Sequence, residues 1–178
     1  MSDIYYHGTQ RFFKEFKLGQ AGVNSTFLGS EPVRRGVIFV AEDYDLAREF
    51  ADQGGSKGHV LAVKANISAT LDISEYGFGC LPESFFEDHG LNPRYYYQLN
   101  PWDAWQAFDL EEGESECLIV EALKAEGYDS VKLMDVSEFD VENTTSIAVF
   151  DPKALCIIDR NLENRPRTMS FDDVGPTP

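Results

Sequence analysis

The sequence predicts one domain of the α+β class, in which strands and helices share a single core. Short runs rich in β-branched and aromatic residues, typical of strands, occur in the first and the last third of the chain. Between them lie segments whose apolar residues recur at helical spacing. The 178 residues, 43% of them hydrophobic, are enough for one core. We expect the domain to span residues 1–160, and residues 161–178 to form a flexible C-terminal tail because Pro, Arg, Asp and Gly dominate there.

The N-terminal segment predicts a strand and then a long loop. Residues 4–7 are apolar and aromatic, and Gly8 ends this run in a turn. Three phenylalanines follow at helix-like spacing and are expected to cover the core: Phe12, Phe13 and Phe16. Residues 19–35 are rich in Gly, Asn, Ser and Thr, and a loop of this length in a compact domain is often functional.

Two further strands flank one helix. Residues 36–40 are β-branched and aromatic, and residues 59–67 alternate so that Val60 and Ala62 share one face. Asp43 is suited to cap a helix that extends to residue 51, and residues 53–58 form a flexible turn. The apolar face of this helix carries Leu46, Ala47 and Phe50.

The middle of the chain carries weaker signals. Residues 71–75 predict a short strand. Residues 82–88 and 101–108 each begin with Pro, which suits the first turn of a helix. Residues 94–97 include three tyrosines and form either a surface feature or a packed loop.

The last third begins with a helix and returns to strands. Residues 115–126 are amphipathic, with Ser115 as N-cap and Gly127 as the C-terminal stop. An acidic segment, residues 135–142, joins the first two of three later strands. Those strands are expected at residues 130–134, 146–150 and 155–158.

Charge and cysteine usage exclude several classes of protein. A formal net charge of −16 argues against direct binding to a nucleic-acid backbone. The same negative charge has two interpretations. It either attracts a basic protein partner by electrostatic steering, or it is simply the surface charge of an ordinary acidic protein. Cys80, Cys117 and Cys156 are too widely spaced for a disulfide framework or a metal site, and the last two are expected in the core. The start of the chain lacks the pattern of a signal peptide and no apolar run is long enough to span a membrane, so a cytoplasmic protein is expected.

One order of segments is distinctive. The first strand ends in Tyr6-His7-Gly8-Thr9, followed by a long polar loop, the strand 36–40 and a helix that carries an aromatic residue. This order resembles the His-Gly-Thr/Ser opening of the diphtheria-toxin and poly(ADP-ribose) polymerase branch of ADP-ribosyltransferases. Residues 127–131 and 148–152 resemble the end of many phage-encoded members, whereas residues 68–114 carry no such likeness.

The resemblance implies a fold and a ligand. The fold is the ADP-ribosyltransferase-like split, mostly antiparallel β-sheet core with flanking helices. The ligand is NAD⁺, used as a substrate whose nicotinamide–ribose bond is broken. By resemblance, the Gly8 backbone binds the nicotinamide amide, His7 holds a ribose hydroxyl, and Thr9 supports the turn or contacts the adenosine side. Phe39 and Phe50 are eleven residues apart, the spacing at which the family places the aromatics that stack on nicotinamide.

Each of these residues also has a purely structural interpretation. A histidine after a strand is often structural, and strands and helices bury Phe routinely, so Phe39 and Phe50 are also candidates for the core. Ser25, Thr26 and Arg35 are polar residues near the long loop that are candidates to meet the pyrophosphate.

The sequence departs from the family at the catalytic carboxylate. The family places a glutamate at the start of a late strand, where this chain has Ser146. A phage anti-CRISPR ADP-ribosyltransferase instead has an aspartate at the end of a Gly-Tyr-x-Ser-Val strand. Residues 127–135 resemble that arrangement and end in Asp135, which we therefore predict as the catalytic acid. Other acids follow in the same segment, and the whole segment is alternatively a solvated loop: Glu138, Asp140 and Glu142.

The function implied is mono-ADP-ribosyl transfer from NAD⁺ to a protein side chain, a glycosyltransferase reaction. His7 would orient the ribose, Phe50 would stack on nicotinamide, and Asp135 would stabilise the positive charge and position the acceptor. The likeness to phage proteins implies an inhibitor of a host defence or other host protein, acting in the host cytoplasm. Two alternatives are an NAD glycohydrolase and an inactive ADP-ribosyltransferase-like module that binds its partner through acidic charge. No metal is implied.

Overall fold

The computed structural model describes residues 4–18, 34–52, 57–110, 114–135 and 144–160. Seven strands form one sheet in which every neighbouring pair is antiparallel except β5 and β7, which are parallel. In spatial order they are β5 (Thr70–Asp72), β7 (Ser130–Met134), β8 (Thr145–Val149), β3 (Ile38–Ala41), β1 (Ile4–Thr9), β4 (His59–Ala65) and β9 (Leu155–Asp159). A separate antiparallel pair joins β2 (Arg34–Arg35) to β6 (Asp109–Leu110). The predicted α+β class with a mostly antiparallel sheet is confirmed.

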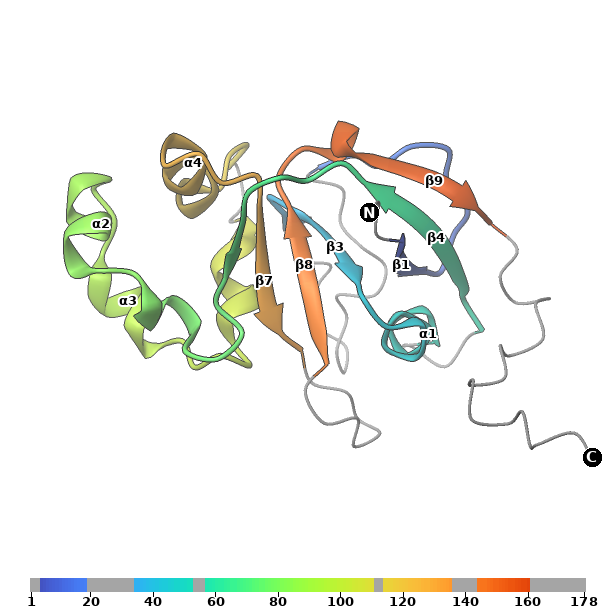
Figure 1. The fold of residues 1–178 in the computed structure, drawn as a ribbon, viewed down its shortest axis with the longest axis horizontal. Coiled ribbons are helices and arrows are strands. Elements are labelled where there is room, and N and C mark those ends of the chain that lie inside the picture. Colours follow the sequence, from blue (N-terminus) through green and yellow to red (C-terminus); the bar gives the residue numbers. More distant parts are fainter. Residues whose placement is uncertain (1–3, 19–33, 53–56, 111–113, 136–143, 161–178) are drawn as a thin grey trace, which may run out of the picture.

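The helices gather in two places around the sheet. Helix α1 (Tyr44–Asp52) packs against β1, β3 and β4, whereas the other α-helices lie toward the β7 and β5 end (Figure 1). Those are α2 (Glu83–Asp88), α3 (Pro93–Gln98) and α4 (Leu118–Ala125). Three short 3₁₀ helices complete the described elements: η3 (Gly77–Cys80), η4 (Ala104–Phe108) and η5 (Pro152–Ala154).

Both faces of the sheet are buried on the β1–β4 side. Val60 packs in the apolar cluster beneath α1, whereas Leu61 and Val63 belong to a cluster that includes Phe16 from the segment after β1. The alternation predicted for this strand is therefore correct, and each of its faces has its own apolar cover. A third cluster lies between β7, β8 and the helices of the middle segment, and its largest fully buried side chains are Phe78, Phe86, Phe108 and Phe150.

Several local expectations hold. The Asp43 carboxylate accepts hydrogen bonds from the backbone N–H groups of Asp45 and Leu46, so it caps α1 as predicted. Gly127 follows α4 with φ of +90°, the left-handed conformation that the C-terminal stop required.

The helix boundaries in the middle of the chain differ from those expected. Residues 94–97 lie in α3, where the Asn92 side chain accepts from the Arg94 N–H and Pro93 occupies the first turn, and only Tyr96 of the three tyrosines is buried. The helix expected from residue 101 is shortened to η4. Pro82 precedes α2 as its N-cap instead of lying in the first turn. The strand expected over residues 71–75 is β5, and ends at Asp72 because the Asp72 carboxylate accepts from the Ser74 N–H and turns the chain.

Three side-chain expectations are wrong. Helix α4 has Cys117 and not Ser115 as its N-cap, with no side-chain cap. Cys156 is exposed because it lies on the opposite face of β9 from the buried Leu155, whereas Cys117 is buried as predicted. Phe12 is exposed and stacks on His59, with ring centroids 3.9 Å apart. The segment that carries it is not helical, so the phenylalanine spacing did not place all three rings in the core.

Candidate functional site

Strands β1 and β3 part from each other in the middle of the sheet. They pair at a single register position, Tyr6 with Ala41, whereas β1 pairs with β4 at six positions and β3 with β8 at four. Since the strands are antiparallel, the residues of β1 after Tyr6 separate from the first half of β3. We call this opening, between His7–Thr9 and Ile38–Val40, the split.

His7 bridges the split. Its Nδ1 lies 2.8 Å from the backbone carbonyl oxygen of Phe39. Because a carbonyl only accepts hydrogen bonds, Nδ1 carries the proton and donates, and in the neutral ring Nε2 is then an acceptor. The His7 ring meets the edges of Phe13 and Phe16 at centroid distances of 5.7 and 5.1 Å. Burial lowers the pKa of His7, and the hydrogen bond to Phe39 offsets part of that shift, so the ring is neutral at pH 7.

Gly8 is the point at which α1 touches β1. A Cβ added to Gly8 would lie 2.0 Å from the Ala47 carbonyl oxygen, 2.7 Å from the Ala51 nitrogen and 3.0 Å from the Phe50 Cβ. The absence of a side chain therefore lets the helix backbone lie directly on the strand. This contact brings Phe50 next to Gly8, two positions that are far apart in the sequence and that the resemblance assigns to nicotinamide binding.

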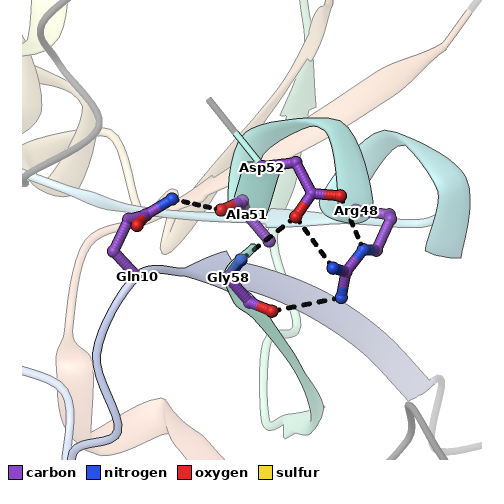
Figure 2. A network of polar contacts seen from close by, with 5 residues as sticks. All are labelled: Gln10, Arg48, Ala51, Asp52 and Gly58. Carbon is purple, nitrogen blue, oxygen red and sulfur yellow. Dashed lines mark hydrogen bonds and ion pairs between the residues drawn. The ribbon is translucent and has the colours of Figure 1, made fainter. Parts of the chain in front are cut away.

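A polar network fixes the C-terminal turn of α1 in this position (Figure 2). The Gln10 side-chain amide donates to the Ala51 carbonyl, and Arg48 forms two hydrogen bonds of 2.8 and 2.9 Å with Asp52. Arg48 also donates to the Gly58 carbonyl at 3.2 Å, and the Gly58 N–H donates to Asp52 at 3.0 Å. Because Gln10 follows β1 and Gly58 precedes β4, the helix end is tied to both strands. Neither Gln10 nor Arg48 belongs to a sequence motif, so both residues were missed from the sequence.

His7 and Phe50 approach the split from different faces of β1. The His7 ring packs with Phe13 and Phe16, whereas Phe50 packs with Tyr6 in the cluster beneath α1. Successive side chains of a strand point to opposite faces, so this division follows from the adjacency of His7 and Gly8. The structure thus brings the predicted residues to one opening of the sheet without stacking them on one surface.

Phe39 lies on the core side of the split. Its ring meets the edge of Phe108 at 6.1 Å, and the Arg35 guanidinium lies 5.2 Å from its centroid. The same guanidinium lies 5.0 Å from the Trp105 ring and forms an ion pair of 3.1 Å with Asp109. Because the Arg35 cation already faces the Phe39 ring, the structure favours a packing role for Phe39. A contact of Phe39 with nicotinamide stays a prediction.

Thr9 has a local partner that accounts for its presence in the motif. Its hydroxyl donates to the Arg11 carbonyl at 3.0 Å and accepts from the Arg11 N–H at 3.3 Å. This is a hydroxyl-stabilised turn at the end of β1, in agreement with the first of its two expected roles.

The predicted acid Asp135 and the unexpected Ser146 are in direct contact. The Ser146 hydroxyl donates to the Asp135 carboxylate at 2.5 Å, and the Asp135 N–H donates to the Thr144 carbonyl at 2.9 Å. The Thr144 hydroxyl donates in turn to the Asp135 carbonyl at 2.8 Å. Ser146 is 1% exposed, whereas Asp135 is half-buried after β7. A carboxylate therefore lies beside the position at which the family places its glutamate. Glu138, Asp140 and Glu142 lie outside the described residues, as do Ser25 and Thr26.

A second carboxylate near the same strands was missed from the sequence. Glu42, directly after β3, accepts from Lys132 at 2.8 Å and from the Thr145 hydroxyl at 2.6 Å. Burial acts to raise the pKa of Glu42, but these two donors outweigh it and the pKa is lowered. Thr145 and Ser146 are adjacent on β8, so their side chains point to opposite faces of the sheet and carry one carboxylate each.

Comparison with known proteins identifies a family over most of the chain. A family model described as ADP-ribosyltransferase in polyvalent proteins matches residues 3–164, including the middle segment that the motifs left unmatched. No curated protein and no solved structure matches the chain.

In the part of the chain that the structure describes, no three His, Cys, Asp or Glu side chains gather closely enough to hold a metal ion. No described helix is both long and apolar enough to cross a membrane.

Proposed function

Because the chain belongs to the family of ADP-ribosyltransferases in polyvalent proteins, we propose that it transfers ADP-ribose from NAD⁺ to a protein side chain. One observation carries this proposal, the contact between the Asp135 carboxylate and the Ser146 hydroxyl at 2.5 Å. A chain with serine at the glutamate position lacks a charge there unless another residue supplies it. Asp135 supplies one from the neighbouring strand.

The chemistry proposed for this carboxylate is electrostatic. Loss of nicotinamide leaves positive charge on the ribose, and a preorganised negative charge in a partly dry site stabilises it far more than the same charge in water. The hydrogen bond from Ser146 holds the carboxylate in one place, and the pairing of Asp135 with Thr144 fixes the main chain behind it. The carboxylate would also position the acceptor side chain.

The other roles follow from the geometry of the split. His7, held by Phe39 through Nδ1, presents Nε2 as an acceptor suited to a ribose hydroxyl. The Gly8 backbone, with its neighbour Phe50 on α1, would receive the nicotinamide amide and ring. A cationic pyridinium ring is attracted to the face of an aromatic side chain, which is the reason for assigning Phe50 this role.

The first experiment measures whether the folded protein binds NAD⁺ by calorimetry and whether it cleaves it. Release of nicotinamide with a mass increase on an added protein supports the transferase, whereas free ADP-ribose as the only product identifies an NAD glycohydrolase. Absence of binding at millimolar NAD⁺ by a protein with a normal melting transition would favour the inactive binding module. We also propose that the chain is a phage protein that inhibits a host protein by modifying it. Identification of the modified protein tests this role.

Ser146→Ala separates the role of the hydroxyl from that of the charge. If Ser146 positions the carboxylate, the variant keeps its NAD⁺ affinity and loses part of its turnover number, about tenfold as expected for one lost hydrogen bond to a charged group. Ser146→Thr, which keeps a hydroxyl donor, should restore part of that loss. Equal turnover in all three proteins would show that Ser146 does not act through Asp135.

A further inference from the structure

The last turn of α1 rests on two neighbouring strands where each of them has a glycine. A Cβ added to Gly58, just before β4, would lie 2.0 Å from the Ala51 carbonyl oxygen and 2.7 Å from the Thr9 carbonyl oxygen. Gly8 on β1 has a similar contact, because a Cβ there would lie 2.7 Å from the Ala51 nitrogen. The fully buried Ala51 is therefore the point at which α1, β1 and the start of β4 meet. We call this meeting point the junction.

The last turn of so short a helix depends on partners outside the helix. Helix α1 has nine residues, whereas isolated helices shorter than about 12–15 residues are marginally stable in water. The carbonyl groups of its last turn have no partner within the helix. Gln10, just after β1, supplies one such partner by donating its side-chain amide to the Ala51 carbonyl (Figure 2).

Arg48 joins the remaining parts of the junction. Its Nε and one terminal nitrogen donate to the two carboxylate oxygens of Asp52 at 2.9 and 2.8 Å (Figure 2). Its other terminal nitrogen donates to the Gly58 carbonyl at 3.2 Å, and the Gly58 N–H donates to Asp52 at 3.0 Å. The Arg48 side chain is 19% exposed. A two-pronged pair of this kind, partly shielded from water, is stronger and more rigid than a typical surface ion pair.

Phe50 is the residue whose position this arrangement fixes. It lies between Arg48 and Asp52 in the chain, and its Cβ is 3.0 Å from the place where a Cβ on Gly8 would be. A shift of Phe50 relative to β1 would therefore strain the hydrogen bonds of the residues on both sides of it. In the proposed function, Phe50 and the Gly8 backbone receive nicotinamide. A binding site loses affinity when one of its contact groups is displaced by about 1 Å.

We propose that Arg48 is a positioning residue for nicotinamide, which holds Phe50 against Gly8 by binding both Asp52 and Gly58. This role rests on the proposed function, because it requires nicotinamide to contact Phe50. It involves no contact between Arg48 and NAD⁺. Lysine is not equivalent at this position, because an ammonium group lacks the planar fork that binds both carboxylate oxygens at once.

The experiment measures by NMR titration the affinity for nicotinamide and, separately, for ADP-ribose, the two parts into which NAD⁺ is cleaved. Arg48→Met should weaken nicotinamide binding about tenfold and leave ADP-ribose binding unchanged. General loosening of the fold would weaken both. Arg48→Lys should restore part of the loss. Lys124→Met, which removes an ion pair of 2.7 Å with Glu121 on α4, is the matched control and should change neither affinity.

Phe50→Leu tests whether Arg48 acts through Phe50. If it does, Arg48→Met should cause a smaller loss of nicotinamide affinity in the Phe50→Leu protein than in the wild type, because the aromatic face to be positioned is already absent. Equal losses in both proteins would overturn the positioning role and leave the proposed function intact. An equal loss of nicotinamide and ADP-ribose affinity in Arg48→Met would do the same.

Hydrogen exchange of the backbone amides of residues 50–52 tests the mechanical step without any ligand. Arg48→Met should speed their exchange about tenfold, because the last turn of α1 opens more often when the network is broken. Unchanged exchange would overturn the positioning role. Absence of nicotinamide binding by the wild-type protein, with faster exchange in Arg48→Met, would instead contradict the proposed function, and the role of Arg48 in it would fall with it.

Discussion

Substitution of Gly8 by Ala tests whether the contact between α1 and β1 organises the candidate site. The new Cβ would lie 2.0 Å from the Ala47 carbonyl oxygen, and a contact of about 3.2 Å is the closest that such atoms tolerate. The helix must therefore move by about 1 Å, because the clashing atoms belong to the backbone and cannot rotate away. Overpacking of this kind costs about 3 kcal/mol of unfolding free energy, the upper part of its usual range.

The assay is thermal unfolding followed by circular dichroism. For a chain of this size, a loss of about 3 kcal/mol lowers the melting temperature by roughly 6–12 °C. Gly79→Ala is the matched control, because a Cβ there meets nothing within 4 Å and its φ is not in the left-handed region. The control should change the melting temperature by less than about 2 °C. A Gly8→Ala protein as stable as this control would refute the close contact, and with it the placement of Phe50 beside Gly8.

Three further predictions follow from the site and the cysteines. The unfolded chain binds a proton to His7 more readily than the folded chain does, since the pKa is lowered in the fold. Stability should therefore fall as the pH drops below about 6.5, and His7→Gln should reduce this slope in urea titrations at several pH values. Asp135→Asn should lower turnover of NAD⁺ about a hundredfold or more with little change in affinity. Glu138→Gln and Glu142→Gln are its controls, and loss of activity in one of them instead would transfer the role to that residue. A thiol reagent should modify Cys156 quickly and Cys117 only on unfolding, because Cys117 is buried and burial raises its pKa.

The sequence was most informative where local and global preferences agree. The alternation around Val60 and the cap at Asp43 both predicted what the structure contains, because each depends on a period or a hydrogen bond within a few residues. The same reasoning failed for Phe12, whose spacing fits a helix but whose segment is not helical, so that its ring stacks on His59 at the surface. It also missed α3, although Asn92 and Pro93 carried a capping signal that a search for N-caps would have found.

The candidate site likewise combines residues that the sequence indicated with contacts that only the structure shows. His7, Gly8 and Thr9 form one contiguous motif, so the sequence alone indicated them and determined that neighbouring side chains point to opposite faces of β1. It also determined that Ser146 lacks the charge the family uses. Three contacts join residues of different elements, namely Asp135 with Ser146, Gly8 with α1, and Arg35 with Phe39. Only the tertiary structure decided these contacts, because strand order and helix packing depend on how the whole chain buries its apolar surface and not on any local pattern.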